Sequence, residues 1–101
     1  MTEVKWYEPD DPTPREQCPC CDYISLPERG NFLICKVCFW EDDGQDLSKI
    51  DLKSGPNYGL TLRQGRKNFR TVGACDPKML KHVLPEHLKQ KLVRKPREDP
   101  Q

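Results

Sequence analysis

Apolar residues in the second half of the chain recur at the spacing of an amphipathic helix. The residues of this apolar face are Leu62, Gly65, Phe69 and Val72. Thr61, with Gln64 three residues later, has the pattern of a capping box, and Gly73 stands where a C-cap glycine belongs. The pattern therefore predicts a helix between Thr61 and Gly73. We expect Gly65 to be there because another backbone packs closely against it.

Two weaker helical segments follow. Asp76 is a capping residue and Pro77 fits the first position of a helix, so a second helix is predicted to begin there. Pro85 restarts the chain, and Leu88 and Leu92 indicate a third, strongly basic helix. We expect residues 96–101 to be frayed.

The first half is predicted to be extended rather than helical. Tyr23–Leu26 and Phe32–Ile34 are typical of two short strands, and the residues between them have turn chemistry, which predicts a β-hairpin. Residues 1–16 are predicted to form an extended proline-rich arm, which Trp6 and Tyr7 can pin onto the domain. Residues 44–59 are predicted to be a loop with one short turn.

Composition limits the chain to one small domain. Its 101 residues are 35% hydrophobic and 33% charged, which leaves little material for a core. We therefore predict a small α+β fold in which residues 17–95 form the domain. A chain of this kind needs a metal or disulfides to stabilise it.

The cysteine spacing provides that metal site. Two C-x2-C pairs, Cys18 with Cys21 and Cys35 with Cys38, are separated by thirteen residues, which is typical of a four-thiolate zinc site. Each pair can direct two sulfurs at one cation, and the predicted hairpin brings the pairs together. The expected architecture is a zinc-ribbon-like first half with two cysteine knuckles, followed by two or three short helices.

Other uses of the cysteines stay open at this point. Six cysteines could form three disulfides, although no secretory signal precedes them. Iron could replace zinc in the same ligand set, and a C-x-x-C pair can also catalyse thiol–disulfide exchange. Cys20 is expected to point away from the metal, with an alternative role as a ligand. Cys75 is expected to be a small buried apolar residue, with a reactive thiol or an exchanged ligand as alternatives.

Four segments resemble the bacterial cysteine-rich CPCC family. They are Cys18–Cys21, Leu26–Gly30, Ile34–Asp43 and Gly73–Asp76. The resemblance covers about residues 17–84 and implies a small zinc-ribbon-like domain without an established enzymatic activity. The sequence departs from a usual ribbon knuckle at Asp22 and Phe39, which occupy places often taken by glycine.

Charge is distributed unevenly along the chain. Residues 1–51 carry 5 basic and 12 acidic side chains, and residues 52–101 carry 12 and 4, although the whole chain has a net charge of only +1. This asymmetry either is neutralised within the fold or indicates charged partners. No stretch is long and apolar enough to span a membrane, and no leader is evident, so a cytoplasmic location is expected.

Three function classes can be weighed from these features. The sequence has no phosphate-binding loop and no hydrolase motif, and a four-thiolate site has no open position for catalytic water, so we do not expect an enzyme. The basic second half, with Arg63, Arg66, Lys67 and Arg70 on one predicted helix, favours nucleic-acid binding as the alternative function.

Protein binding is the preferred function. Two aromatic residues and a run of acids follow the second cysteine pair and are predicted to form a partner-binding face. They are Phe39, Trp40, Glu41, Asp42, Asp43 and Asp46. Such a face would suit a basic partner. Because the resemblance implies small proteins that can be encoded beside toxins, an immunity or inhibitor role is the sharper form of this hypothesis.

Overall fold

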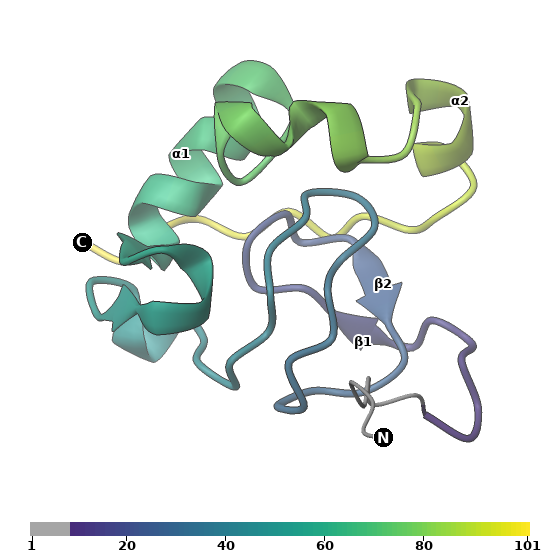
Figure 1. Ribbon diagram of the computed structural model, residues 1–101, viewed down its shortest axis with the longest axis horizontal. Coiled ribbons are helices and arrows are strands. Elements are labelled where there is room, and N and C mark those ends of the chain that lie inside the picture. Colours follow the sequence, from purple (N-terminus) through teal and green to yellow (C-terminus); the bar gives the residue numbers. More distant parts are fainter. Residues whose placement is uncertain (1–8) are drawn as a thin grey trace, which may run out of the picture.

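A computed structural model describes residues 9–101 (Figure 1). It is a small α+β protein, which confirms the predicted class. Its strands are β1 (Glu16–Gln17), β2 (Ile24–Leu26), β3 (Lys53–Ser54) and β4 (Leu60–Thr61), and its α-helices are α1 (Leu62–Val72) and α2 (Glu86–Lys89). Its 3₁₀ helices are η1 (Leu47–Lys49), η2 (Gly55–Asn57) and η3 (Pro77–His82). The roles predicted for Trp6 and Tyr7 lie outside the described residues.

The strands pair differently from the predicted hairpin. β1 pairs with β2 around the first cysteine pair, and Ile34 forms an isolated antiparallel bridge with Glu41 around the second. The physical reason is that each C-x2-C segment is itself a tight turn, so it reverses the chain and brings its own flanks together. The segment around Phe32 makes no ladder with β2 and instead carries a positive φ of 61° at Phe32.

Helix α1 begins and ends where the sequence predicts. The Thr61 hydroxyl accepts a hydrogen bond from the Gln64 amide, the Gln64 side chain accepts one from the Thr61 amide, and Gly73 takes the left-handed C-cap conformation. Gly65 allows close packing, as predicted, but its neighbours are side chains, whereas the prediction was another backbone. A Cβ at this position would stand 2.9 Å from the ring of Trp40 and 3.2 Å from the sulfur of Cys20.

Residues 44–59 hold more structure than the predicted loop. They contain η1, β3 and η2, and β3 pairs with β4 directly before α1. The two helical segments after Gly73 lie where predicted, but η3 is a 3₁₀ helix and α2 is a single short turn of α-helix. Asp76 caps η3 by accepting a hydrogen bond from the Lys78 amide.

The last residues return to the domain rather than fray. In Figure 1 the chain runs from α2 back beneath the helices and ends beside α1. The Arg97 amide donates to the Asp22 carboxylate at 2.7 Å, and the Asp99 carboxylate accepts from Arg66. Residues 97–99 are therefore part of the folded unit, although the prediction had separated residues 96–101 from it.

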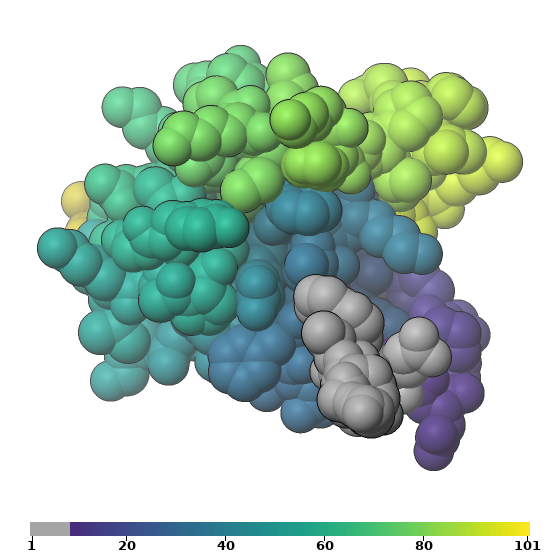
Figure 2. Space-filling view, in the orientation of Figure 1, coloured from purple at the N-terminus to yellow at the C-terminus, as the bar shows by residue number. Residues whose placement is uncertain are grey.

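The core lies between the two halves of the chain. The six cysteines cluster there with Trp40, Leu26, Leu62, Val37 and Ile50. In the space-filling view the green helical segments of the second half lie above the blue cysteine-bearing segment (Figure 2). Within residues 9–101, none of the helices has the length and apolarity needed to cross a membrane.

Candidate metal centre

Each cysteine pair forms the same hydrogen-bonded turn. In the first, the carbonyl of Cys18 accepts from the Asp22 amide at 2.9 Å, and the Cys18 amide donates to the Tyr23 carbonyl at 2.8 Å. In the second, Cys35 makes the equivalent bonds with Phe39 and Trp40, at 2.8 and 2.9 Å. We call these two turns, residues 18–23 and 35–40, the first and second knuckles.

Both knuckles require a positive φ at the same place. Asp22 has a φ of 66° and Phe39 a φ of 70°, in the left-handed region that glycine usually supplies. These are the two positions at which the sequence departs from a usual ribbon knuckle. The departure therefore leaves the geometry of the turn unchanged, and it provides a carboxylate in one knuckle and an aromatic ring in the other.

The two knuckles bring four sulfurs together as predicted. The Sγ atoms of Cys18, Cys21, Cys35 and Cys38 all lie within 4.8 Å of one another, and all four residues are buried. The Cys18–Cys38 and Cys21–Cys35 Sγ distances are both 3.7 Å. A tetrahedral site with metal–sulfur bonds of ~2.3 Å has sulfur–sulfur edges of about 3.8 Å. The donor set therefore fits one tetrahedral metal ion.

The electrostatics of the cluster favour a cation at its centre. Burial raises the pKa of Cys18 and of Cys38 well above the usual thiol value. Burial also opposes ionisation of Cys35, but hydrogen bonds from the other three thiols and from Ser25 outweigh it and hold the pKa of Cys35 well below that value. Four thiolates at this spacing repel one another, and a metal cation between them would compensate that repulsion.

Two polar groups support the sulfur of Cys35 from outside the tetrahedron. The Val37 amide donates to it at 3.3 Å, and the Ser25 hydroxyl lies 3.0 Å from it. Such contacts orient a ligating sulfur and reduce its charge. Ser25 belongs to β2, so the pairing of β1 with β2 positions this hydroxyl. The sequence prediction missed Ser25, since its position in a strand gave no sign of a role at the metal.

The two remaining cysteines are buried outside this group of four. Cys20 occupies in the first knuckle the position that Val37 occupies in the second, and its sulfur packs against Gly65. The Cys75 amide donates to the Cys38 carbonyl at 2.8 Å, and burial raises the pKa of the Cys75 thiol. No cysteine is disulfide-bonded. Both residues therefore act as small apolar side chains in the core.

Comparison with known proteins agrees with this geometry. The model of the cysteine-rich CPCC family matches residues 16–98. The chain belongs to the cysteine-rich CPCC family. The match includes both knuckles and α1, and it ends at residue 98, just before Asp99. Searches among curated proteins and among solved structures found no match.

The predicted partner-binding face is not assembled as an exposed acidic surface in this CPCC protein. Trp40 and Asp42 are 1% and 0% exposed, and Phe39 stacks on His82 with ring centroids 4.9 Å apart. Phe39 and Trp40 therefore belong to the packing of the second knuckle. Their rings hold the knuckle against α1 and η3.

The three aspartates of that face accept hydrogen bonds within the protein, whereas the Glu41 carboxylate has no partner among residues 9–101. The Asp42 carboxylate accepts hydrogen bonds from Arg29 and from the Gly30 and Gly44 amides. The Asp43 carboxylate accepts them from the Ser54 hydroxyl and the Gln45 amide. The Asp46 carboxylate accepts them from Arg29 and Arg97. Glu41 is half-buried, and burial raises its pKa. The sequence pattern was misleading because the side chains that pair with these aspartates, Arg29, Ser54 and Arg97, lie between 11 and 51 residues away in the chain.

An ion-pair network beside the first knuckle was not predicted. Arg66 is 2% exposed and uses every donor of its guanidinium. Its guanidinium makes a bidentate ion pair with Asp22, with N–O distances of 2.8 and 2.9 Å. It also donates to the Asp99 carboxylate at 2.6 Å and to the carbonyls of Pro19 and Arg97. The signal was present in the sequence, since Arg66 stands four residues after Leu62 and three before Phe69, on the apolar face of α1.

The same network removes most of the predicted nucleic-acid patch. Arg63 pairs with Asp51, Arg66 with Asp22 and Asp99, and Arg70 with Asp99. Of the four basic residues named on this helix, only Lys67 makes no ion pair with a described residue. Among residues 9–101, the arginines Arg63, Arg66 and Arg97 of the second half pair with aspartates of the first half, so the charge asymmetry between the halves is neutralised only in part.

Proposed function

We propose that this CPCC protein is a non-enzymatic protein-interaction module whose fold is held by one structural zinc ion. The observation that carries the metal part is the four-sulfur cluster, with its tetrahedral spacing and complete burial. Four protein ligands complete the coordination of zinc and leave no position for a substrate or a catalytic water. Cys18, Cys21, Cys35 and Cys38 would hold the ion, which would supply cross-linking rather than chemistry.

Exposed apolar side chains support the interaction part. Phe32 is 56% exposed, Tyr58 81% and Leu80 48%, in a chain with few large apolar residues. Phe32 and Tyr58 also have positive φ values of 61° and 59°. Exposed aromatic residues in strained backbone are more typical of a binding surface than of a stabilising core. A basic toxin as the partner gains little support from the acids after the second knuckle, because the three aspartates Asp42, Asp43 and Asp46 are paired internally.

The metal part is tested by native mass spectrometry of tagged full-length protein, purified from its own cells without added metal. We expect one zinc ion per chain. Cys35→Ser should lose the ion, whereas Cys75→Ser, a matched change of a buried cysteine outside the cluster, should retain it. Iron in place of zinc, or metal retention by Cys35→Ser, would contradict the proposed site.

The interaction part is tested in the same spectra. We expect a second protein chain at stoichiometric ratio, which rebinds when both components are purified separately and mixed. A chain that stays free of protein partners after gentle purification and after chemical cross-linking in cells would contradict the interaction role. Co-purification of nucleic acid that is removed by nuclease would favour the alternative function.

A further inference from the structure

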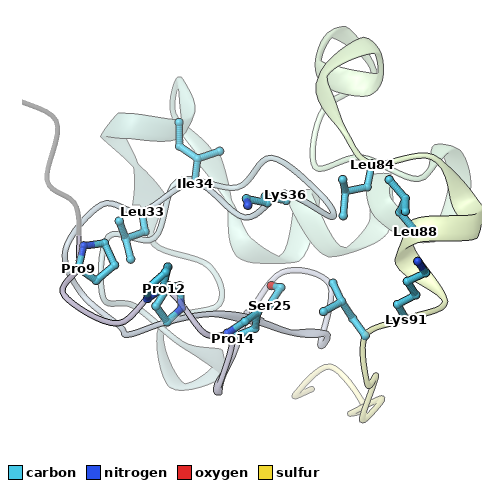
Figure 3. A pocket seen from close by; sticks show the side chains of 12 residues that line it. Pro9, Pro12, Pro14, Ser25, Leu33, Ile34, Lys36, Leu84, Leu88 and Lys91 are labelled. Carbon is cyan, nitrogen blue, oxygen red and sulfur yellow. The ribbon is translucent and has the colours of Figure 1, made fainter.

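An apolar groove lies on the side of the protein formed by the arm, the second knuckle and the last helix. Its volume is about 700 Å³, which is in the range of sites that accept ligand side chains. Pro12 and Pro14 of the arm form one wall, Ile34 lies at the second knuckle, and Leu84 and Leu88 form the opposite wall (Figure 3). The groove is open to solvent and contains few polar groups.

Both walls are attached to the metal-bearing part of the fold. The Leu84 amide donates to the Lys36 carbonyl, within the second knuckle, at 3.0 Å. The Arg15 amide donates to the Leu26 carbonyl at 2.9 Å, which holds the end of the arm against β2. Because one wall is fixed to the second knuckle and the other to β2, the groove is preformed, and filling it costs less ordering entropy than closing a loop would.

The rim of the groove carries unpaired positive charge. Lys36 and Lys91 line the groove, are exposed, and make no ion pair with any residue of the described chain. Every ion pair between described residues joins an arginine to an aspartate. In the arm, next to the lining residue Pro12, Asp11 is already paired with Arg15. All the arginines except Arg94 are therefore paired with an aspartate, whereas Lys36 and Lys91 have no acidic partner among residues 9–101.

We propose that the groove binds an acidic amphipathic peptide segment of a partner protein. Bulky apolar side chains of the segment fill the space between the arm and Leu88, and its carboxylates pair with Lys36 and Lys91. The complementarity favours a peptide over a nucleic acid, because phosphates gain nothing from a groove walled by proline and leucine. This inference rests on the proposed interaction function and assigns it a surface and a class of partner.

The test uses full-length, zinc-loaded protein and a phage-displayed library of random 12-residue peptides. We expect enriched sequences to combine two or more bulky apolar residues with Asp or Glu. A synthetic peptide of the enriched sequence should bind at least about tenfold more weakly to Lys36→Glu/Lys91→Glu, since both complementary charges are reversed. Lys49→Glu/Lys53→Glu is the matched control. It makes the same charge change at exposed lysines remote from the groove and should keep its affinity within about twofold.

A second variant tests the apolar wall. Leu88→Gln should also weaken the peptide about tenfold, because the groove loses its leucine side chain. Zinc content and a dispersed NMR spectrum verify that each variant is folded. Peptides that bind all variants equally, or a library that yields no groove-dependent sequence, would overturn the proposal.

Three other occupants are distinguished in the same experiments. Concentration-dependent dimerisation blocked by Leu88→Gln would assign the groove to a second copy of the chain. Peptide binding only after deletion of residues 1–8 would assign it to the chain's own N-terminus, and binding to phosphatidylglycerol vesicles instead of peptides would assign it to a lipid surface. Each of these results contradicts the proposal. A protein partner that still binds Lys36→Glu/Lys91→Glu would contradict the groove while leaving the interaction function standing.

Discussion

Asp22 shows how much a single residue does beside the metal centre. Its backbone takes the left-handed conformation that ends the first knuckle, and its buried carboxylate accepts hydrogen bonds from Arg66 and Arg97. Burial opposes its ionisation, but those arginines outweigh it and hold the pKa of Asp22 below the usual carboxyl value. The same residue therefore shapes the turn and links it to α1 and to the C-terminal segment.

We predict that Asp22→Asn lowers the free energy of unfolding by about 3–5 kcal/mol, because the buried guanidinium of Arg66 loses its charged partner. Asparagine also tolerates a positive φ, so the knuckle itself is preserved. The measurement is urea denaturation of zinc-loaded protein. Asp51→Asn is the control, since the Asp51–Arg63 pair is exposed and solvent screens such a pair, so its loss should cost much less stability. Equal losses for the two variants would contradict the role of the network.

At the scale of elements, the predictable features are the local ones. The knuckle ligands, the capping box at Thr61 and the C-cap at Gly73 depend on residues within a few positions of each other, so spacing identified them. The strand pairing and the use of Asp42 depend on contacts across the fold, and the sequence offered no local sign of Arg29 as the partner of Asp42. The neutralisation of α1 by the C-terminal segment was missed for the same reason.

The contribution of that C-terminal segment to the stability of the fold depends on pH. Burial opposes ionisation of Asp99, but hydrogen bonds from Arg70 and Arg66 outweigh it, so the pKa of Asp99 is below its usual value. A carboxyl group whose folded-state pKa is lowered contributes stability above its unfolded pKa of about 3.9. That contribution is lost as pH falls through the lower folded-state pKa.

We therefore predict that Asp99→Asn costs about 1.5–3 kcal/mol at pH 7, where charged hydrogen bonds are lost. The difference from the unchanged protein should stay constant down to about pH 5 and shrink below about pH 4. Urea denaturation at a series of pH values measures it, with the exposed Asp10→Asn as a control that should change stability by less than about 0.5 kcal/mol. A cost for Asp99→Asn that does not depend on pH would contradict the ion pair.

At the scale of the whole molecule, the second half of the chain is organised by the backbone of the knuckles. The Cys75 amide donates to the Cys38 carbonyl, the Leu84 amide to the Lys36 carbonyl and the Lys95 amide to the Asp22 carbonyl, at 2.8, 3.0 and 3.0 Å. These backbone contacts add to the packing of Trp40 against α1 and to the Arg66 network, in a chain with only 35% hydrophobic residues. The four-sulfur site thus determines where the helices lie as well as how the first half folds.

The central claim is that one zinc ion and the fold form together, and it is tested most directly by adding zinc to reduced, metal-free protein. NMR dispersion and circular dichroism should change together and reach completion at one equivalent of zinc, because binding of structural zinc supplies ~10–16 kcal/mol of apparent free energy. Cys75→Ser should follow the same titration, and Cys18→Ser should not fold. A metal-free chain that already gives the complete dispersed spectrum would contradict the account.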